Sequence, residues 1–169
     1  QRRKLSLMTD WLSLPAGAEV LDLGAGWGGF ASHAARSGLK VTGYSLSKQQ
    51  LTYCADMLRQ QKLDSSVVLE YRDMLASLPE GKFDGAVMLE SIEHVGKDNL
   101  PSCMQNLYGA LKPGAPCVVQ LTGRYEPRGV DRWTLKYVFP GGYLPANAEL
   151  LRAAEDAGFV VEEFRDDTG

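Results

Sequence analysis

The chain has 169 residues, enough for one domain with its own hydrophobic core. A formal net charge of −3 argues against nucleic acid as a general partner, and no apolar run is long enough to span a bilayer. The basic N-terminal stretch QRRKLSLMTDWLSL lacks the clean apolar core and small-residue cleavage site of a secretory signal. These properties favour a globular domain over a DNA-binding or membrane-spanning protein.

Three cysteines, Cys54, Cys103 and Cys117, are scattered along the chain and odd in number. This usage argues against a disulfide framework and predicts a reducing compartment, which we take to be the cytoplasm. None of the three has metal-ligand spacing, so we expect no metal site and assign the thiols to packing.

Helical and strand-like segments alternate along the chain. A capping box at Ser47-x-x-Gln50 begins one helix, and Gly38 and Gly158 end two others. Such βα alternation predicts an α/β fold, a mostly parallel sheet with helices on both faces. The expected helices span residues 3–14, 30–37, 47–62, 100–111 and 147–157, and the expected strands span residues 20–23, 40–44, 67–71, 83–89, 116–121 and 159–164.

Residues 122–145 form a long segment rich in glycine, proline and aromatic side chains, with no pattern of regular structure. In a compact domain such an insert is more often a lid or binding segment than filler. Its aromatic rings could line an apolar groove or stabilise a cation, or they could form a small packed cluster under the loop. These rings belong to Tyr125, Trp133, Tyr137, Phe139 and Tyr143.

The stretch VLDLGAGWGG, residues 20–29, ends the first expected strand in a glycine-rich turn. Gly24, Gly26 and Gly29 fit the G-x-G-x-x-G spacing of a dinucleotide loop, which by itself is a weak signal. A nicotinamide site would place an acid after the second strand, but the chain has Tyr44-Ser45 there. Asp22 would repel a pyrophosphate and would suit a cofactor that carries a sulfonium and an amino acid. The turn therefore predicts an S-adenosylmethionine site.

Six motifs occur in a fixed order along the chain: VLDLGAGWGGFA, VTGYSLSKQQL, EYRD, SIEHVG, LKPG and YVFPGGYLP. Together they resemble the cyclopropane-fatty-acid synthase family of class I S-adenosylmethionine methyltransferases, which includes the mycolic acid cyclopropane synthases. The resemblance runs through nearly the whole chain. It implies a Rossmann-like class I methyltransferase fold, with residues 1–169 forming a single cofactor-binding domain and residues 122–145 an insert or lid.

The resemblance also assigns cofactor contacts. Gly24, Ala25 and Gly26 would pass under the methionine part, although the family usually has Cys in place of Ala25. Gln50 would hold the ribose with Ser45, or it could serve only in the capping box. The remaining expected cofactor residues are Asp22, Leu46 and Leu89, together with Arg72 and Asp73, which would flank the adenine. Asp73 could instead be a solvated loop acid.

In the family, the nucleophile is a cis double bond of a lipid chain. Methyl transfer leaves a carbocation, and a base must then take a proton so that the ring closes. The resemblance implies that a bound bicarbonate is this base, held partly by Glu93. His94 could be a general base, a hydrogen-bond donor or a packing residue, and Gln120 can hydrogen-bond an anion. Glu90 we expect to be a surface residue. The family commonly has His in place of Gln120, and because an amide cannot shuttle a proton, this departure bears on ring closure more than on methyl transfer.

Two other functions fit the sequence. A methyltransferase of the same fold could act at N, O or C of a small metabolite or polyketide, and a binding module could hold the cofactor without catalysis. A phospholipid acceptor would imply peripheral membrane contact. The resemblance further implies that the chain is an excerpt of a longer protein, whose flanking segments contribute to the site.

Overall fold

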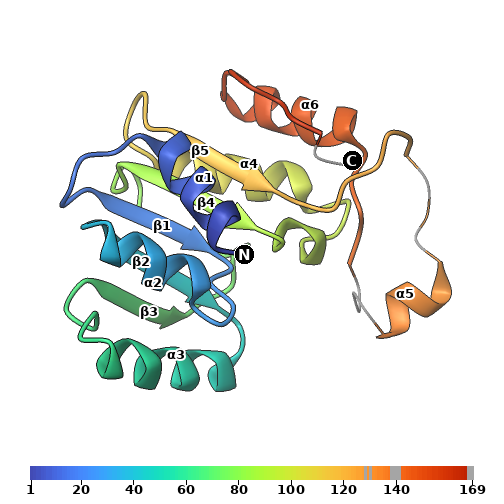
Figure 1. Ribbon diagram of the computed structural model, residues 1–169. Coiled ribbons are helices and arrows are strands. Elements are labelled where there is room, and N and C mark those ends of the chain that lie inside the picture. Colours follow the sequence, from blue (N-terminus) through green and yellow to red (C-terminus); the bar gives the residue numbers. More distant parts are fainter. Residues whose placement is uncertain (128, 130, 138–141, 167–169) are drawn as a thin grey trace.

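A computed structural model describes residues 1–127, 129, 131–137 and 142–166. Five parallel strands form one sheet in the order β3-β2-β1-β4-β5, and their arrows point the same way in Figure 1. The expected parallel sheet is thereby confirmed. The strands are β1 (Glu19–Leu23), β2 (Lys40–Ser45), β3 (Val67–Tyr71), β4 (Gly85–Leu89) and β5 (Cys117–Gln120).

Helices cover both faces of the sheet, as expected. On one face α1 (Arg2–Leu12), α2 (Gly29–Arg36) and α3 (Lys48–Gln60) pack against Val20 of β1. On the other face α4 (Leu100–Ala110) and α6 (Asn147–Ala157) pack in the cluster that contains Leu21. Successive residues of a strand point to opposite faces, so β1 is apolar on both sides, which is the pattern of a strand buried between two helical layers.

The carboxyl ends of two helices show which residues end them. Helix α1 ends at Leu12, because Ser13 adopts a left-handed conformation and its amide donates to the carbonyl of Asp10. The expected helix over residues 3–14 was therefore two residues too long at its carboxyl end. Helix α6 ends where expected, at Gly158 with φ +108.

The expected strand over residues 159–164 is wrong, because residues 159–166 have no regular structure. The amide of Phe159 donates to the carbonyl of Ala154 and closes the end of α6, and the Phe159 ring packs edge-on against Tyr108. The first residue of the expected strand is thus held by helices. The following Val160 is 85% exposed and pairs with no neighbouring strand in the described part of the chain.

The insert over residues 122–145 is not entirely irregular, because α5 (Arg132–Tyr137) lies within it. Figure 1 shows α5 apart from the helices that cover the sheet. Phe139, one of the aromatic residues singled out from the sequence, lies outside the described residues. Among the described residues, no helix is both long and apolar enough to cross a bilayer.

Candidate cofactor and acceptor site

The candidate site lies at the carboxyl edge of the sheet, where the strand order changes direction between β1 and β4. The chain builds β1, β2 and β3 outward on one side, then crosses to β4 and β5 on the other. Loops that leave neighbouring strands on opposite sides of such a point open a crevice between them. The glycine turn after β1 and the loop after β4 therefore face each other.

The glycine turn is packed tightly against the loop after β4. The amides of Gly24 and Ala25 both donate to the carbonyl of Tyr44, at 3.2 and 2.9 Å. A Cβ added to Gly24, whose φ is +105, would lie 2.3 Å from Cβ of Ser91. The Ser91 hydroxyl in turn donates to the carbonyl of Leu23 at 2.7 Å. Glycine at position 24 is thus required by the protein itself.

Gly26 differs from Gly24 in its surroundings. Its φ is +51, and an added Cβ would meet no atom nearer than the Gly24 carbonyl oxygen at 3.9 Å. The backbone there borders space that the protein leaves open. A turn whose first glycine is packed and whose second is bare leaves room for a ligand to approach the main chain.

Asp22 lies under this turn and is 1% exposed. Burial raises its pKa from 3.8 to about 7, and its Oδ2 has no hydrogen-bond partner among the described residues. Buried polar atoms are nearly always paired, so an orphaned carboxylate oxygen calls for an external partner. The sequence placed Asp22 beside the ligand; the structure covers the carboxylate with protein, so its charge acts through a medium of low polarity.

Ser45 and Gln50 form one hydrogen-bonded unit at the end of β2. The Ser45 hydroxyl donates to Oε1 of Gln50 at 3.0 Å and accepts from the amide of Ser47 at 3.1 Å. Ser47 caps α3 through the amide of Gln50, but the Gln50 side chain does not return to Ser47. The expected capping box is therefore only half formed, because Ser45 takes the place of Gln50 at the Ser47 amide.

Of the remaining expected cofactor residues, three follow the ends of β2 and β3, and Leu89 ends β4. Arg72 stacks over the Tyr44 ring, 5.1 Å from its centroid. The exposed Asp73 accepts from the amide of Leu75 at 2.9 Å, which fits the solvated loop acid and leaves part of the carboxylate for another donor. Leu46 is 53% exposed, and Leu89 is half-buried at the end of β4.

Glu93 lies on the other side of the point where the strand order reverses. From the roles predicted by the sequence, we call the side with the glycine turn, β2 and β3 the cofactor half and the side with β4 and β5 the acceptor half. Glu93 lies in the short 3₁₀ helix η1 (Ile92–His94), which the sequence did not predict, and it is 1% exposed. Its Oε1 accepts from the amide of Thr122 at 2.7 Å, and its carbonyl accepts from the amide of Tyr143 at 2.8 Å. Its Oε2 is buried without a partner among the described residues. His94, next along the chain, is exposed.

A lysine that sequence reasoning missed also reaches this half. Lys4 Nζ lies 2.7 Å from Oε1 of Glu90 and 3.3 Å from Oε1 of Gln120. The ammonium lowers the pKa of the Glu90 carboxyl through this hydrogen bond. Glu90 is largely exposed, as expected, but it has a positive φ of 52 and is not a free surface acid. No local motif could have indicated Lys4, because its partners are 86 and 116 residues away.

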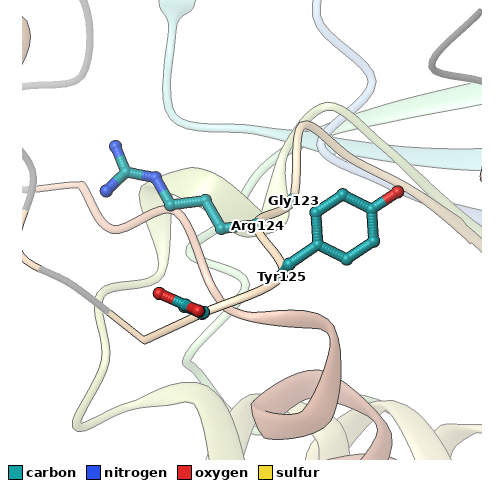
Figure 2. Close-up of a pocket in the computed structure, with 4 residues that line it drawn as sticks. Gly123, Arg124 and Tyr125 are labelled. Atoms are coloured by element: carbon teal, nitrogen blue, oxygen red, sulfur yellow. The ribbon is translucent and has the colours of Figure 1, made fainter.

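The insert begins beside a surface pocket lined by Gly123, Arg124, Tyr125 and Glu126. In Figure 2 the side chains of Arg124 and Tyr125 point away from each other across the backbone. Tyr125 is 75% exposed, and Trp133 and Tyr137 of α5 are also exposed, so these rings do not form a buried cluster. Tyr143, at the far end of the insert, is tied to α6 by a hydrogen bond to Glu149 at 2.5 Å.

The cysteines lie away from the acceptor chemistry. Cys54 and Cys103 are buried and Cys117 is half-buried, all three as free thiols. Burial raises the pKa of Cys103 to about 11 and that of Cys117 to about 12, which keeps both thiols protonated and inert. The Cys54 thiol supports the glycine turn by donating to the carbonyl of Gly26 at 3.4 Å.

Curated proteins similar to this chain act on fatty acyl groups according to their names. A Pseudomonas putida protein named "probable fatty acid methyltransferase" is 36% identical over 95% of the chain. The cyclopropane-fatty-acyl-phospholipid synthase of Escherichia coli K12 is 32% identical over 97% of the chain. The chain spans 43% and 42% of the lengths of these two relatives.

The fold has close counterparts among solved structures. The cyclopropane synthase MmaA2 of Mycobacterium tuberculosis superposes on the chain with a TM-score of 0.84 at 20% sequence identity. The superposition covers 95% of this chain and 61% of the MmaA2 chain. The shared fold is the Rossmann-like fold of class I methyltransferases. The sequence also matches the family described as mycolic acid cyclopropane synthetase over residues 1–166. Because that match covers almost the entire sequence, the chain belongs to the mycolic acid cyclopropane synthetase family.

Proposed function

We propose that residues 1–169 form the S-adenosylmethionine-binding domain of a methyltransferase that alkylates an unsaturated fatty acyl chain. The observation that carries the proposal is the pair of buried carboxylates, Asp22 and Glu93, each with one oxygen that has no hydrogen-bond partner among the described residues. Asp22 lies in β1 and Glu93 lies in the loop after β4, and these are the two strands on either side of the point where the sheet order reverses. One would face a cationic cofactor and the other the reacting acceptor.

The cofactor half fits an adenosyl sulfonium in its donor set. Asp22 supplies negative charge below the turn, and the bare backbone at Gly26 leaves space for the methionine part. The Ser45–Gln50 unit presents a hydroxyl and an amide to a ribose, and Asp73 and Arg72 flank the position of an adenine. Ala25, Leu46 and Leu89 complete the expected contacts. When bound, S-adenosylmethionine supplies a methyl group already activated for transfer.

The acceptor half then has to exclude water and accept one proton. An alkene needs no base before it attacks, so the protein positions the double bond in line with the activated methyl. The carbocation that follows closes to a cyclopropane when one proton leaves the new methyl group. Glu93, with Oε2 free, can orient the base for this proton, and His94 and Gln120 border the same strand ends. Bicarbonate is the base we propose, because its hydroxyl can donate to Glu93 Oε2.

The setting of the reaction is part of the same proposal. An acyl acceptor carried by a phospholipid would bring the protein into peripheral contact with a membrane. The free thiols of the described residues are compatible with the reducing cytoplasm inferred from the sequence. The insert over residues 122–145 we propose as the segment that covers the acceptor.

The experiment that tests the function is lipid mass spectrometry after expression of the whole protein that contains this chain. Unsaturated acyl chains should gain 14 mass units, the mass of one methylene group. Cells fed methionine with a trideuterated methyl group distinguish the chemistry. Ring closure loses one deuterium from the transferred methyl, whereas methylation at N, O or a simple carbon nucleophile retains all three.

A matched variant tests whether the lipid product depends on the cofactor turn. Gly26→Val should remove the lipid product because its side chain would fill the open space at the turn. An unchanged lipid profile for the wild-type protein, together with normal binding of S-adenosylhomocysteine, would favour a non-catalytic module. A labelled small metabolite in place of a lipid would favour the small-molecule methyltransferase.

A further inference from the structure

Helix α1 places one cation over the acceptor half of the site. It packs against β4 and β5, and Lys4 on it contacts both Glu90 and Gln120 at the ends of these strands. We propose that Lys4 is a positioning residue, which turns the Gln120 amide into the hydrogen-bond donor of an anion site completed by Glu93. This inference rests on the proposed function, in which the anion is bicarbonate.

The orientation of the Gln120 amide follows from the chemistry of lysine. An ammonium group can only donate hydrogen bonds, so the amide must present its oxygen to Lys4. The 3.3 Å contact is indeed between Nζ and Oε1. The amide nitrogen of Gln120 carries two N–H groups. One faces the Glu90 carboxylate, where it helps to lower the pKa of Glu90, and the second is available to a ligand. A side chain that could present either end to a ligand is thereby held as a donor.

Glu93 offers the complementary acceptor, and it is tied to Thr122, which lies two residues after Gln120. The amide of Thr122 occupies its Oε1 at 2.7 Å, while Oε2 is buried and unpartnered. A planar anion that carries one O–H group matches one acceptor and one donor. The hydroxyl of bicarbonate would donate to Glu93 Oε2, and another of its oxygens would accept from the Gln120 amide.

Lys4 also offsets a charge that would otherwise oppose this anion. Glu90 and Glu93 lie three positions apart in the loop after β4, and two carboxylates repel a bicarbonate. The ammonium of Lys4, 2.7 Å from Glu90, compensates one of these charges. Loss of Lys4 would remove the donor that fixes Gln120 Oε1, so that only the Glu90 carboxylate would still hold this amide, and it would leave the Glu90 charge uncompensated.

The test measures bicarbonate binding rather than turnover. The whole protein, saturated with S-adenosylhomocysteine in carbonate-free buffer, is titrated with sodium bicarbonate in a calorimeter. Lys4→Met should weaken bicarbonate binding at least about tenfold, the range expected for one charge-assisted hydrogen bond. Affinity for S-adenosylhomocysteine should be unchanged, and Lys4→Arg should restore most of the bicarbonate affinity.

Two further variants keep the test decisive. Lys40→Met removes an exposed lysine at the opposite edge of the sheet and should bind bicarbonate as the wild type does. Gln120→Glu keeps the shape of the side chain but replaces the donor with an acceptor, so it should also lose bicarbonate and carries the test if Lys4→Met fails to fold. Equal bicarbonate affinity in Lys4→Met and wild type, or no binding by the wild type, would overturn the inference.

The failure of this inference and that of the proposed function look different. Lipid products with normal mass gain, but bicarbonate binding indifferent to Lys4, would remove only the role of Lys4. Bicarbonate binding that depends on Lys4, with no methylated lipid, would remove the acyl acceptor and leave the anion site in place.

Discussion

The two halves of the site are built by different kinds of contact. In the cofactor half, Ser45, Ser47 and Gln50 bond to one another within five residues of sequence. In the acceptor half, Glu93 is held by Thr122, 29 residues away, and Lys4 reaches Gln120 across 116 residues. Local contacts form with little loss of chain entropy, whereas distant ones depend on the whole fold. Cofactor binding should therefore tolerate changes that abolish acceptor chemistry.

The strongest way to break the cofactor half is Gly26→Val. The added side chain meets no protein atom nearer than 3.9 Å, so folding should survive apart from a strain of about 1–3 kcal/mol at positive φ. The cofactor would lose its path along the backbone, and we expect affinity for S-adenosylhomocysteine to fall by more than about 100-fold. Calorimetric titration measures this loss, and retained micromolar binding would refute the placement of the cofactor.

Gly24→Ala provides the matched contrast two residues away. Its Cβ would lie 2.3 Å from Cβ of Ser91, so this variant should destabilise the fold itself, by roughly 3 kcal/mol or more. Urea unfolding of both variants separates the two effects. If Gly26→Val proves as unstable as Gly24→Ala, the open space at Gly26 is not a ligand site.

Glu93→Gln is the corresponding test of the acceptor half. The amide oxygen can still accept from Thr122, so the fold and the cofactor half should remain intact. The unpartnered Oε2 becomes an N–H₂ group, which cannot accept a proton or a bicarbonate hydroxyl. We expect kcat to fall about 100-fold or more, within the usual contribution of general acid–base catalysis. Binding of S-adenosylhomocysteine should change less than about twofold.

Steady-state kinetics and calorimetry on the same preparation check this separation. Equal losses in turnover and in cofactor affinity would assign Glu93 to the cofactor or to the fold. The comparison between the two halves would then lose its chemical meaning, because one carboxylate would serve both.

A pH titration sharpens the comparison, since it addresses Asp22 alone. Its pKa is about 7 in the folded protein against 3.8 ordinarily, because burial disfavours the charged form. Between roughly pH 4 and 7 the folded state thus holds a proton that the unfolded state has lost, and the free energy of unfolding should fall as the pH rises. A cationic cofactor favours the ionised form, so its affinity should rise by up to about tenfold per pH unit toward pH 7.

Dissociation constants for S-adenosylmethionine, which carries the sulfonium charge, measured from pH 5 to 8 test this linkage, with urea unfolding over the same range. Asp22→Asn should flatten both curves in this window. Persistence of the same slopes in Asp22→Asn would show that another group titrates, and would remove Asp22 from the cofactor half.

The sequence predicted the parts of this molecule that depend on neighbours in the chain. Strand β3 and helix α6 have the expected bounds, because glycine caps and apolar runs act within a few residues. The strand over residues 159–164 was wrong, because a strand needs a partner and Phe159 is instead held by Tyr108 and the end of α6. The contacts of Lys4 could not be predicted for the same reason, because a contact across 86 or 116 residues leaves no periodicity or motif in the sequence.

The site followed the same division. Gly24, Ser45 and Asp22 could be placed at the strand ends because parallel strands bring their carboxyl ends to one edge. The hydrogen-bond partner of the Gln50 side chain could not be predicted, because the Ser45 hydroxyl and the Ser47 amide both lie within five residues of it along the chain. Which carboxylate oxygens stay unpartnered is a property of packing, and it becomes visible only in the folded structure.

The smallest expected effect belongs to Gln50→Ala, which removes one partner of Ser45. The Ser45 hydroxyl keeps its bond from the amide of Ser47, so α3 should still begin at the same place. If Gln50 contacts the ribose, affinity for S-adenosylhomocysteine should fall about tenfold, the cost of one net hydrogen bond. Gln49→Ala, at the exposed neighbouring position, is the control and should bind normally. Identical affinities in the two variants would reduce Gln50 to a support for Ser45, and the cofactor half would then select its ligand by the glycine turn and Asp22 rather than by the ribose.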